Sequence, residues 1–343
     1  MRAARWTSKD AALVVTDVPD PTPGPDDVLV AIMACGICSS DLHLMDGSLR
    51  SSLDVVTPGH EAAGTIVEVG RDVRDFAPGD HVIIAGGRPC GECAACRTAR
   101  SHRCLNFKIM GFDYDGGWAE YVAAPAALLT RAPANVPIEQ AAILADAVAT
   151  PYAGLVHRAR LSAAQSVGIW GIGGLGVHAV RIARMIGAYP VVAIDPLPAA
   201  RRRALEAGAD LAIDPQDDDL RERIRKATGG LGLDLAVDVV GSNAVLAQAV
   251  SCLAPRGTAL MIGLTRDPLQ LGPAVALGVR RQSIIGHLGY DKHHLDEVAD
   301  LVAAGRLDVS ASVTATVGLT DVETGIRMLA SKDSAPVRIV VKP

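Results

Sequence analysis

The chain has 343 residues, of which 49% are hydrophobic and 21% are charged. This length predicts about two domains, and the composition is typical of globular proteins and excludes a disordered chain. The net charge of −5 gives no general attraction to nucleic acid or anionic membranes, and no apolar run reaches the roughly 18 residues of a membrane span. The first residues, MRAARWTSKD, lack the apolar core of a signal peptide. We therefore expect a cytoplasmic protein without nucleic-acid or membrane partners.

The first part of the chain has the sequence pattern of an all-β domain. Residues 1 to about 125 alternate short β-type runs, such as DVLVAIMAC, AAGTIVEVG and DHVIIAG, with turns rich in proline and glycine. This alternation predicts an antiparallel domain that resembles a barrel or a sandwich.

A four-cysteine cluster lies within this part. The segment CGECAACRTARSHRC places Cys90, Cys93, Cys96 and Cys104 at the spacing C-x2-C-x2-C-x7-C. In a reducing cytoplasm such a cluster indicates a metal site rather than disulfides. Four thiolates this close predict a tetrahedral structural zinc. An iron–sulfur cluster is the alternative for the same four cysteines.

From about residue 137 the sequence changes to alanine-rich helical stretches. The run SVGIWGIGGLGVHAVRIARMIGAYPVVAID then predicts a buried strand, a glycine-rich turn, a helix and a second strand. The same alternation continues in GLDLAVDVVG and GTALMIGL, which predicts a doubly wound parallel sheet. The tail from about residue 291 predicts two helices and the final strand VRIVVK.

The glycine-rich turn predicts a dinucleotide site. Gly171, Gly173 and Gly176 form the pattern G-x-G-x-x-G between a strand and a helix, and Asp195 follows at the end of the next strand. The glycines let the backbone approach a pyrophosphate, and the acid accepts hydrogen bonds from the adenosine ribose. Because a carboxylate repels a 2′-phosphate, NAD is expected rather than NADP. The basic run at 201–203 is either a phosphate clamp or, as we prefer, a solvated helix face.

Several motifs together carry a resemblance to a known family. The segments GICSSDLH, GHEAAG, the four-cysteine loop, GGWAEY and GIGGLG occur in the order found in zinc-dependent medium-chain alcohol dehydrogenases. The chain resembles this family over essentially its whole length. The resemblance implies an α/β protein with a discontinuous barrel-like (GroES-like) catalytic domain at 1–153 and 291–343, and a Rossmann domain at 154–290.

The resemblance also implies a catalytic zinc, with Cys38 and His60 as two of its ligands. Taken alone, Asp146 in the apolar run AAILADAVATPYAGL is a helix cap or a residue of a solvated turn. Many relatives place a third ligand, often cysteine, four residues before a threonine, and here Asp146 precedes Thr150 in this way. Carboxylate oxygen also binds zinc, so Asp146 is the expected third ligand, with the fourth position open for substrate.

Four further residues take roles from the same resemblance. Ser40 is expected to hydrogen-bond the substrate hydroxyl, and His43 to pass the proton toward solvent. Asp41 is expected to orient His60, and Glu61 is the acidic neighbour of the metal. The expected cofactor-binding residues are Thr150, Gly171, Gly173, Gly174, Leu175, Gly176, Asp195, Val240, Ile262 and Gly263.

The resulting expectation is an NAD-dependent alcohol dehydrogenase with two zinc ions per chain. Its substrate would be a small alcohol or carbonyl compound, with secondary alcohols or polyols preferred. The alternatives are an NADP(H)-dependent carbonyl or double-bond reductase of the same superfamily, and a non-catalytic protein that keeps the fold. The segment QSIIGHLGY at 282–290 predicts an apolar edge strand, which suggests a homodimer or homotetramer.

Overall fold

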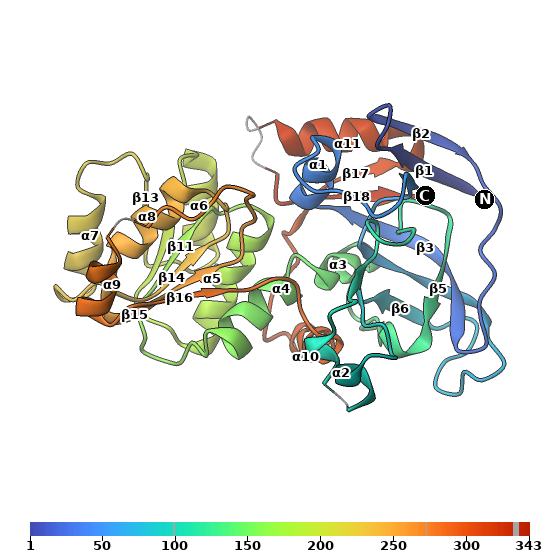
Figure 1. Cartoon of the computed structure of the whole chain (residues 1–343), viewed down its shortest axis with the longest axis horizontal. Helices are drawn as coiled ribbons and strands as arrows, with labels where there is room; N and C mark the ends of the chain where they lie inside the picture. The colour runs from blue at the N-terminus through green and yellow to red at the C-terminus, as the bar shows by residue number, and fades with distance from the viewer. Residues whose placement is uncertain (99, 272, 332–335) are drawn as a thin grey trace. The chain divides into compact units, whose positions relative to one another are not determined.

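The computed structural model describes residues 1–98, 100–271, 273–331 and 336–343 (Figure 1). The described residues divide into two compact units. The first unit comprises Met1–Ala149, Tyr290–Ser331 and Pro336–Pro343, and the second comprises Thr150–Gly289. Both ends of the chain therefore belong to the first unit. The sequence predicted the division after residues 153 and 290.

The first unit contains a seven-stranded sheet in the order β10-β6-β5-β3-β18-β17, with β9 also paired to β3. All its pairs are antiparallel except β17 with β18. Its strands are β3 (Asp27–Ile37), β5 (Glu61–Val69), β6 (His81–Ile84), β9 (Tyr121–Pro125), β10 (Leu129–Arg131), β17 (Val313–Gly318) and β18 (Arg338–Lys342). Alternate residues of β3, such as Val28 and Val30, are buried in the core, as expected for a strand with one face inward.

Two smaller sheets and several short helices complete this unit. The small sheets are β2 (Ala12–Asp17), β1 (Arg2–Thr7) and β4 (Val55–Val56), and β7 (Gly87–Arg88) with β8 (Lys108–Ile109). The α-helices are α1 (Ser39–Met45), α2 (Ala94–Arg97), α3 (Ile138–Ala142), α10 (Lys292–Ala303) and α11 (Val322–Ala330). Short 3-10 turns are Ser101–Arg103, Ala126–Leu128, Ile143–Ala145 and Leu319–Asp321. The helix α4 (Ala149–Tyr152) and the π-helical turn Ala153–Arg158 lead into the second unit.

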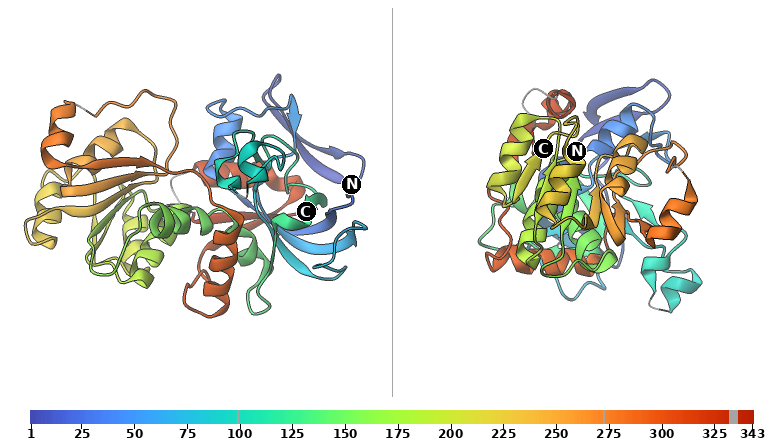
Figure 2. Two further views of the ribbon diagram at one scale, coloured as in Figure 1. Left: turned by 60° about the horizontal axis from the view of Figure 1, so that its bottom comes forward. Right: turned by 90° about the vertical axis from the view of Figure 1, so that its left-hand side faces the viewer.

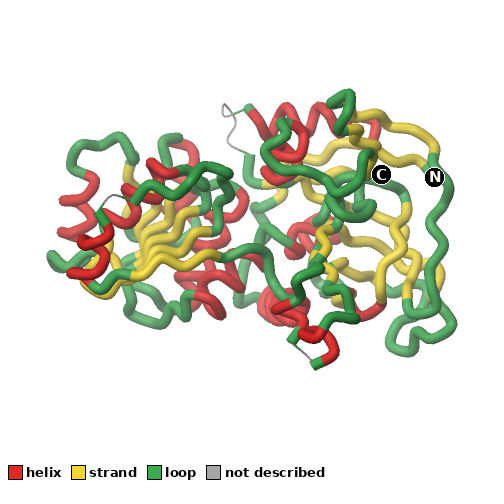
Figure 3. Tube along the Cα trace, in the orientation of Figure 1, coloured by secondary structure: helices red, strands yellow, loops and turns green. Residues whose placement is uncertain are grey.

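The second unit is a six-stranded parallel sheet in the order β13-β12-β11-β14-β15-β16, with helices along it (Figures 1, 2 and 3). Its strands are β11 (Val167–Trp170), β12 (Val191–Ile194), β13 (Leu211–Ile213), β14 (Leu233–Asp238), β15 (Leu253–Met261) and β16 (Ser283–Gly286). Its remaining helices are α5 (Gly174–Ile186), α6 (Pro198–Glu206), α7 (Leu220–Ala227), α8 (Asn243–Ser251) and α9 (Ala274–Arg280).

The strand order explains where a ligand would bind in this unit. The strands β11 and β12 are buried at every residue, which explains their continuous apolar sequences. The strand β11 lies between β12 and β14, so the order reverses beside it. In such sheets the carboxyl ends of the strands at the reversal form the ligand crevice.

The fold class predicted from the sequence is confirmed, because one unit is a largely antiparallel, barrel-like sheet and the other is a doubly wound parallel sheet. In the part of the chain that the structure describes, no helix is both long and apolar enough to cross a membrane.

Candidate active site

The three expected zinc ligands meet in the first unit. Cys38 follows β3, His60 precedes β5, and Asp146 follows the turn Ile143–Ala145. The Cys38 Sγ lies 3.2 Å from the Asp146 Oδ2, and the His60 Nε2 lies 3.8 Å from the same oxygen. Two strand ends and one turn therefore bring together a thiol, an imidazole and a carboxylate.

The spacing of these donor atoms fits a zinc ion. Their ligand atoms, together with one from Glu61, all lie within 4.8 Å of one another. Zn–S bonds of about 2.3 Å and Zn–N or Zn–O bonds of about 2.0–2.2 Å put tetrahedral ligand atoms roughly 3.4–3.6 Å apart. Sulfur, nitrogen and oxygen donors are those that zinc takes in proteins. One zinc can therefore be held by Cys38, His60 and Asp146.

Helix α1 carries the other residues expected at this site. The Oδ2 of Asp41, which is fully buried, accepts the backbone N–H of Cys38 at 2.8 Å, and its Oδ1 lies 3.6 Å from the His60 Nδ1. Asp41 therefore faces two of the expected zinc ligands. The Ser40 Oγ lies 3.3 Å from the His60 Nε2, which is the nitrogen that faces the other ligands. The His43 side chain, 37% exposed, approaches Asp46 with its Nδ1 3.6 Å from the Oδ2.

Glu61 occupies space left by a glycine. Gly36 pairs with Glu61 across β3 and β5, and a Cβ at Gly36 would overlap the Glu61 Oε2. The carboxylate instead meets Arg338, whose Nη2 lies 2.6 Å from the Glu61 Oε1 and 3.2 Å from the Asp146 Oδ2. Sequence reasoning missed Arg338. An arginine directly before the apolar run 339–341 of the final strand was the available signal.

The charged groups of this cluster shift one another's pKa values. Burial raises the pKa of the Cys38 thiol and of Glu61, and the Arg338 guanidinium opposes both shifts. Burial alone would lower the pKa of Arg338, but the neighbouring Glu61, Cys38 and Asp146 raise it above its ordinary value. Arg338 is therefore a permanent cation beside the expected ligands.

The four cysteines form a second compact group, within 4.8 Å of one another through their sulfur atoms. The Cys93 Sγ lies 3.5 Å from the Cys96 Sγ, and the Cys90 Sγ lies 4.0 Å from the same atom. Tetrahedral sulfurs on one zinc are about 3.8 Å apart. The Cys96 backbone N–H lowers the pKa of the Cys93 thiol to about 6, and burial raises the pKa of the Cys96 thiol, so Cys93 forms the thiolate that a metal needs before Cys96 does. The group fits one zinc with no open position.

The glycine-rich turn lies between β11 and α5. Gly171 has a φ of +92°, and a Cβ at Gly176 would overlap the Gly171 carbonyl oxygen, so both positions require glycine. A Cβ at Gly173 would meet nothing within 4 Å, so its backbone is open to a ligand at the helix N-terminus. Gly174 and Leu175 form the first turn of α5. The turn fits a dinucleotide pyrophosphate.

The other expected cofactor residues lie at or near the same edge of the sheet. Asp195 follows β12 and accepts the backbone N–H groups of Ile172 and Leu197 at 2.7 and 2.8 Å. Gly263 follows β15 and packs against the loop after β14. A Cβ at Gly263 would overlap the backbone nitrogen of Gly241. The remaining expected residues are Thr150 and Ile262, which are buried, and Val240, which is 49% exposed.

Comparison with known proteins decides the family. The family model described as the alcohol dehydrogenase GroES-like domain matches residues 24–134, and the model described as zinc-binding dehydrogenase matches residues 174–304. The L-threonine 3-dehydrogenase of Pyrococcus furiosus is 34% identical over 314 residues, which are 89% of this chain and 87% of that protein. The chain belongs to the zinc-dependent medium-chain dehydrogenases.

Solved structures of similar proteins agree with this assignment. A Sinorhizobium meliloti protein bound to NADP has a TM-score of 0.92 and 30% identity, with 100% of this chain and 99% of that chain covered. The acetophenone reductase of Geotrichum candidum in complex with NAD has a TM-score of 0.87 and 30% identity, with 100% and 97% covered. This medium-chain dehydrogenase is an oxidoreductase that acts on alcohols with zinc and a nicotinamide cofactor.

The structure corrects our interpretation of the basic run of this dehydrogenase. A solvated helix face was preferred, but only Arg202 is exposed. The Arg201 Nη1 pairs with the Asp214 Oδ2 at 2.7 Å, and the Arg203 Nη2 donates to the Ile172 carbonyl oxygen at the glycine-rich turn. Both side chains instead bond acceptors in the loops that follow β13 and β11.

Asp238 is a second residue that the sequence did not single out. It ends β14, is 2% exposed, and its Oδ1 accepts the backbone N–H groups of Val240 and Gly241 at 2.8 and 3.0 Å. Burial raises the pKa of this carboxyl. Asp238 therefore shapes the loop that carries Val240. The signal was an acid at a strand end, as for Asp195.

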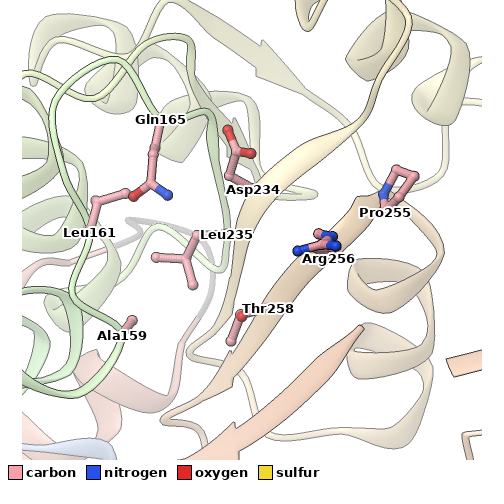
Figure 4. Close-up of a pocket in the computed structure, with 8 residues that line it drawn as sticks. All are labelled: Ala159, Leu161, Gln165, Asp234, Leu235, Pro255, Arg256 and Thr258. Carbon is pink, nitrogen blue, oxygen red and sulfur yellow. The ribbon is translucent and has the colours of Figure 1, made fainter. Parts of the chain in front are cut away.

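Two other features of the dehydrogenase lie apart from these sites. A hollow in the second unit lies at the amino ends of its strands and is bordered by Gln165, Asp234 and Arg256 (Figure 4). This is the edge opposite to the glycine-rich turn. A third group of possible metal donors consists of Asp291, His293 and His294. The side chains of Asp291 and His294, however, form the capping box of α10. Their placement is explained by the helix cap.

Proposed function

We propose that this dehydrogenase interconverts a secondary alcohol or polyol with its carbonyl compound, using NAD and a zinc held by Cys38, His60 and Asp146. The convergence of these three donors beside Ser40 carries the proposal. The preference for secondary alcohols is supported by two relatives, because threonine carries a secondary hydroxyl at C3 and acetophenone is a ketone. We assign catalysis to residues 1–153 and 291–343, and dinucleotide binding to 154–290.

The chemistry divides between the bound groups and the chain. When bound, zinc acts as a Lewis acid toward the substrate oxygen, and the nicotinamide exchanges a hydride. The Ser40 Oγ, 3.3 Å from the ligand nitrogen of His60, accepts the proton of the substrate hydroxyl while its own hydroxyl proton leaves toward His43. His43, three residues later on the same face of α1, passes that proton to solvent through its partly exposed imidazole. Asp41 holds His60 in one orientation.

We assign a second, structural zinc to the four-cysteine group. Four thiolates occupy every tetrahedral position, so this ion takes no part in turnover. Its role is to hold together a loop whose two helical turns, Ala94–Arg97 and Ser101–Arg103, are each too short to be stable alone.

We assign NAD as the cofactor because of Asp195. Its carboxylate ends β12 beside the glycine-rich turn, in the position that suits ribose hydroxyls and repels a 2′-phosphate. The pyrophosphate and nicotinamide contacts are assigned to Gly171, Gly173, Gly174, Leu175, Gly176, Thr150, Val240, Ile262 and Gly263. An NADP(H)-dependent carbonyl reductase is the second candidate, because Arg203 lies beside the same turn and a similar protein binds NADP.

We also propose that the enzyme is a homodimer or homotetramer. The strand β16 is at the edge of the parallel sheet, and exposed sheet edges favour pairing with another chain. Val279, which is 77% exposed, and Leu288, which is 66% exposed, lie on either side of this strand in the sequence. A two-fold contact would cover these apolar side chains.

A substrate screen tests the proposed function. NAD reduction is measured over primary, secondary, cyclic and polyhydroxy alcohols. The Ser40→Ala variant is measured on the same alcohols as the wild type. We expect the highest kcat/KM for a secondary alcohol or polyol, and a large loss of kcat in the variant. Turnover only with NADPH and carbonyl compounds would favour the second candidate. Equal rates in the wild type and Ser40→Ala would contradict the assigned proton path.

A further inference from the structure

The hollow in the second unit lies at the amino ends of the parallel strands, at the edge opposite to the glycine-rich turn (Figure 4). Its volume is about 350 Å³, at the lower end of the roughly 300–1,000 Å³ of small-molecule sites. All the residues that border it belong to the second unit. The function proposed above gives none of them a role.

Arg256 borders the hollow with a backbone conformation that favours glycine. Its φ is +68°, in the left-handed region that is strained for a residue with a Cβ. The side chain is exposed and, within the described part of the chain, has no hydrogen-bond or ion-pair partner. Strained backbone positions are concentrated at functional sites. A strained arginine without a partner in the protein therefore favours a ligand as the partner of its guanidinium.

A carboxylate borders the same hollow without pairing with this arginine. Asp234 lies in β14, and Arg256 lies in the neighbouring strand β15 (Figure 4). The Asp234 Oδ2 accepts the backbone N–H and the hydroxyl of Ser166, each at 2.8 Å. Among the residues that the structure describes, its Oδ1 accepts no hydrogen bond, and no ion pair joins it to Arg256. The hollow therefore presents a cation and an anion that remain apart.

Gln165 adds a hydrogen-bond donor to the hollow. Its Oε1 accepts the backbone N–H of Ser162 at 2.9 Å and the Ser162 hydroxyl at 3.1 Å. Because the backbone N–H needs an acceptor, these bonds fix the amide with its oxygen toward Ser162 and its Nε2 toward the hollow (Figure 4). Leu161 and Leu235, which are 7% and 4% exposed, supply an apolar wall. The hollow thus combines donors, a carboxylate and an apolar surface.

We propose that the hollow binds a small α-amino acid as its zwitterion. The ligand carboxylate pairs with the planar guanidinium of Arg256 and accepts a hydrogen bond from the Gln165 Nε2. The ligand ammonium group donates to the Asp234 carboxylate, and its aliphatic side chain packs on Leu161 and Leu235. A ligand with only one of the two charges would leave either Arg256 or Asp234 unpaired. Opposite charges on two sides of the hollow therefore select a zwitterion.

Calorimetric titration with L-valine tests the proposal. Valine has no hydroxyl that the dehydrogenase could oxidise, so its binding is separate from the proposed function. Isovalerate is valine without the ammonium group, and isobutylamine is valine without the carboxylate. We expect valine to bind about tenfold or more tightly than either analogue, because each analogue loses a charge-assisted hydrogen bond. Isovalerate that binds as tightly as valine, or no valine binding at millimolar concentration, would overturn the proposal.

The left-handed backbone supplies a variant that should fold. Arg256→Gly removes the guanidinium, and glycine adopts a φ of +68° without strain; valine binding should weaken by about tenfold or more. Arg281→Gly is the matched control, because Arg281 is also exposed and has a φ of +55° but does not border the hollow. It should bind valine as the wild type does. If Arg256→Gly does not fold, Arg256→Asn replaces it, since asparagine tolerates this conformation. Undiminished valine binding in the folded variant would contradict the proposal.

The place of the hollow predicts that valine binding is independent of the cofactor. The hollow lies at the edge of the sheet opposite to the glycine-rich turn, so saturating NADH should leave the dissociation constant of valine unchanged. Valine that is displaced by NADH and unaffected by Arg256→Gly would be bound in the dinucleotide crevice, and this result would refute the proposal. Because neither readout involves zinc or turnover, a failure of the proposed function is distinguishable from a failure of this site.

Discussion

Replacing Asp146 by asparagine should remove the catalytic zinc while keeping the fold. The amide has nearly the same shape as the carboxylate but is neutral and a weaker zinc donor. The charge lost lies 3.2 Å from the Arg338 Nη2 and 3.8 Å from the His60 Nε2. Asp146 therefore belongs both to the proposed metal site and to an ion pair with the buried Arg338.

The structure allows both effects to be estimated. Opposite charges 3.2 Å apart attract by about 5 kcal/mol at an effective dielectric near 20. Desolvation offsets much of this attraction, and Arg338 keeps Glu61 at 2.6 Å. We therefore expect the metal-free variant to lose about 1–3 kcal/mol of unfolding free energy. Zinc affinity should fall by about a hundredfold or more, since even outer contacts are worth about 10–100-fold.

The assay combines chelator competition for zinc with single-turnover hydride transfer. Asp146→Cys should retain the metal, because it restores a thiolate donor, although the Zn–S bond of about 2.3 Å would shift the ion. Asp296→Asn is the control: it breaks contacts to Thr130 and Lys292 at 2.7 and 2.8 Å and should lower stability without changing zinc affinity. A fully active Asp146→Asn variant with two zincs would refute the reasoning.

Three further predictions concern the other sites. Asp195→Ala should improve kcat/KM with NADP relative to NAD by tenfold or more. The reason is that two like charges about 4 Å apart repel by about 4 kcal/mol at an effective dielectric near 20. An unchanged ratio of the two kcat/KM values would indicate that Arg203 controls the cofactor preference. Cys104→Ser should reduce zinc from two ions to one per chain and lower the thermal midpoint, and a variant that keeps both ions would contradict the four-cysteine assignment. Light scattering at micromolar concentration should show a dimer or tetramer, and a monomer would contradict pairing through β16.

Contiguous motifs made much of the fold and site predictable. The four cysteines lie within one short loop, and the glycines of the turn sit between a buried strand and a helix, so local sequence was enough to place them. Asp146 was different, because nothing within its apolar run indicates a partner. It was found through the resemblance, and the structure brings it to Cys38 across 108 residues of sequence.

The residues that were missed or misjudged depend on long-range contacts. Arg338 reaches Glu61 across 277 residues and Asp146 across 192, and no local pattern reports such a pairing. Arg201 and Arg203 looked solvated because their helix is polar. Their acceptors, Asp214 and the Ile172 carbonyl, belong to other segments at the edge of the sheet.

The most direct test of the central claim follows zinc content and activity together. The enzyme is dialysed exhaustively, its zinc is measured by elemental analysis, and a chelator is then added in steps while NAD reduction is recorded. We expect about two zincs per chain, with activity lost as the first ion leaves, because the site of Cys38, His60 and Asp146 has an open position and the four-cysteine site has none. A ratio near one with full activity would contradict this account.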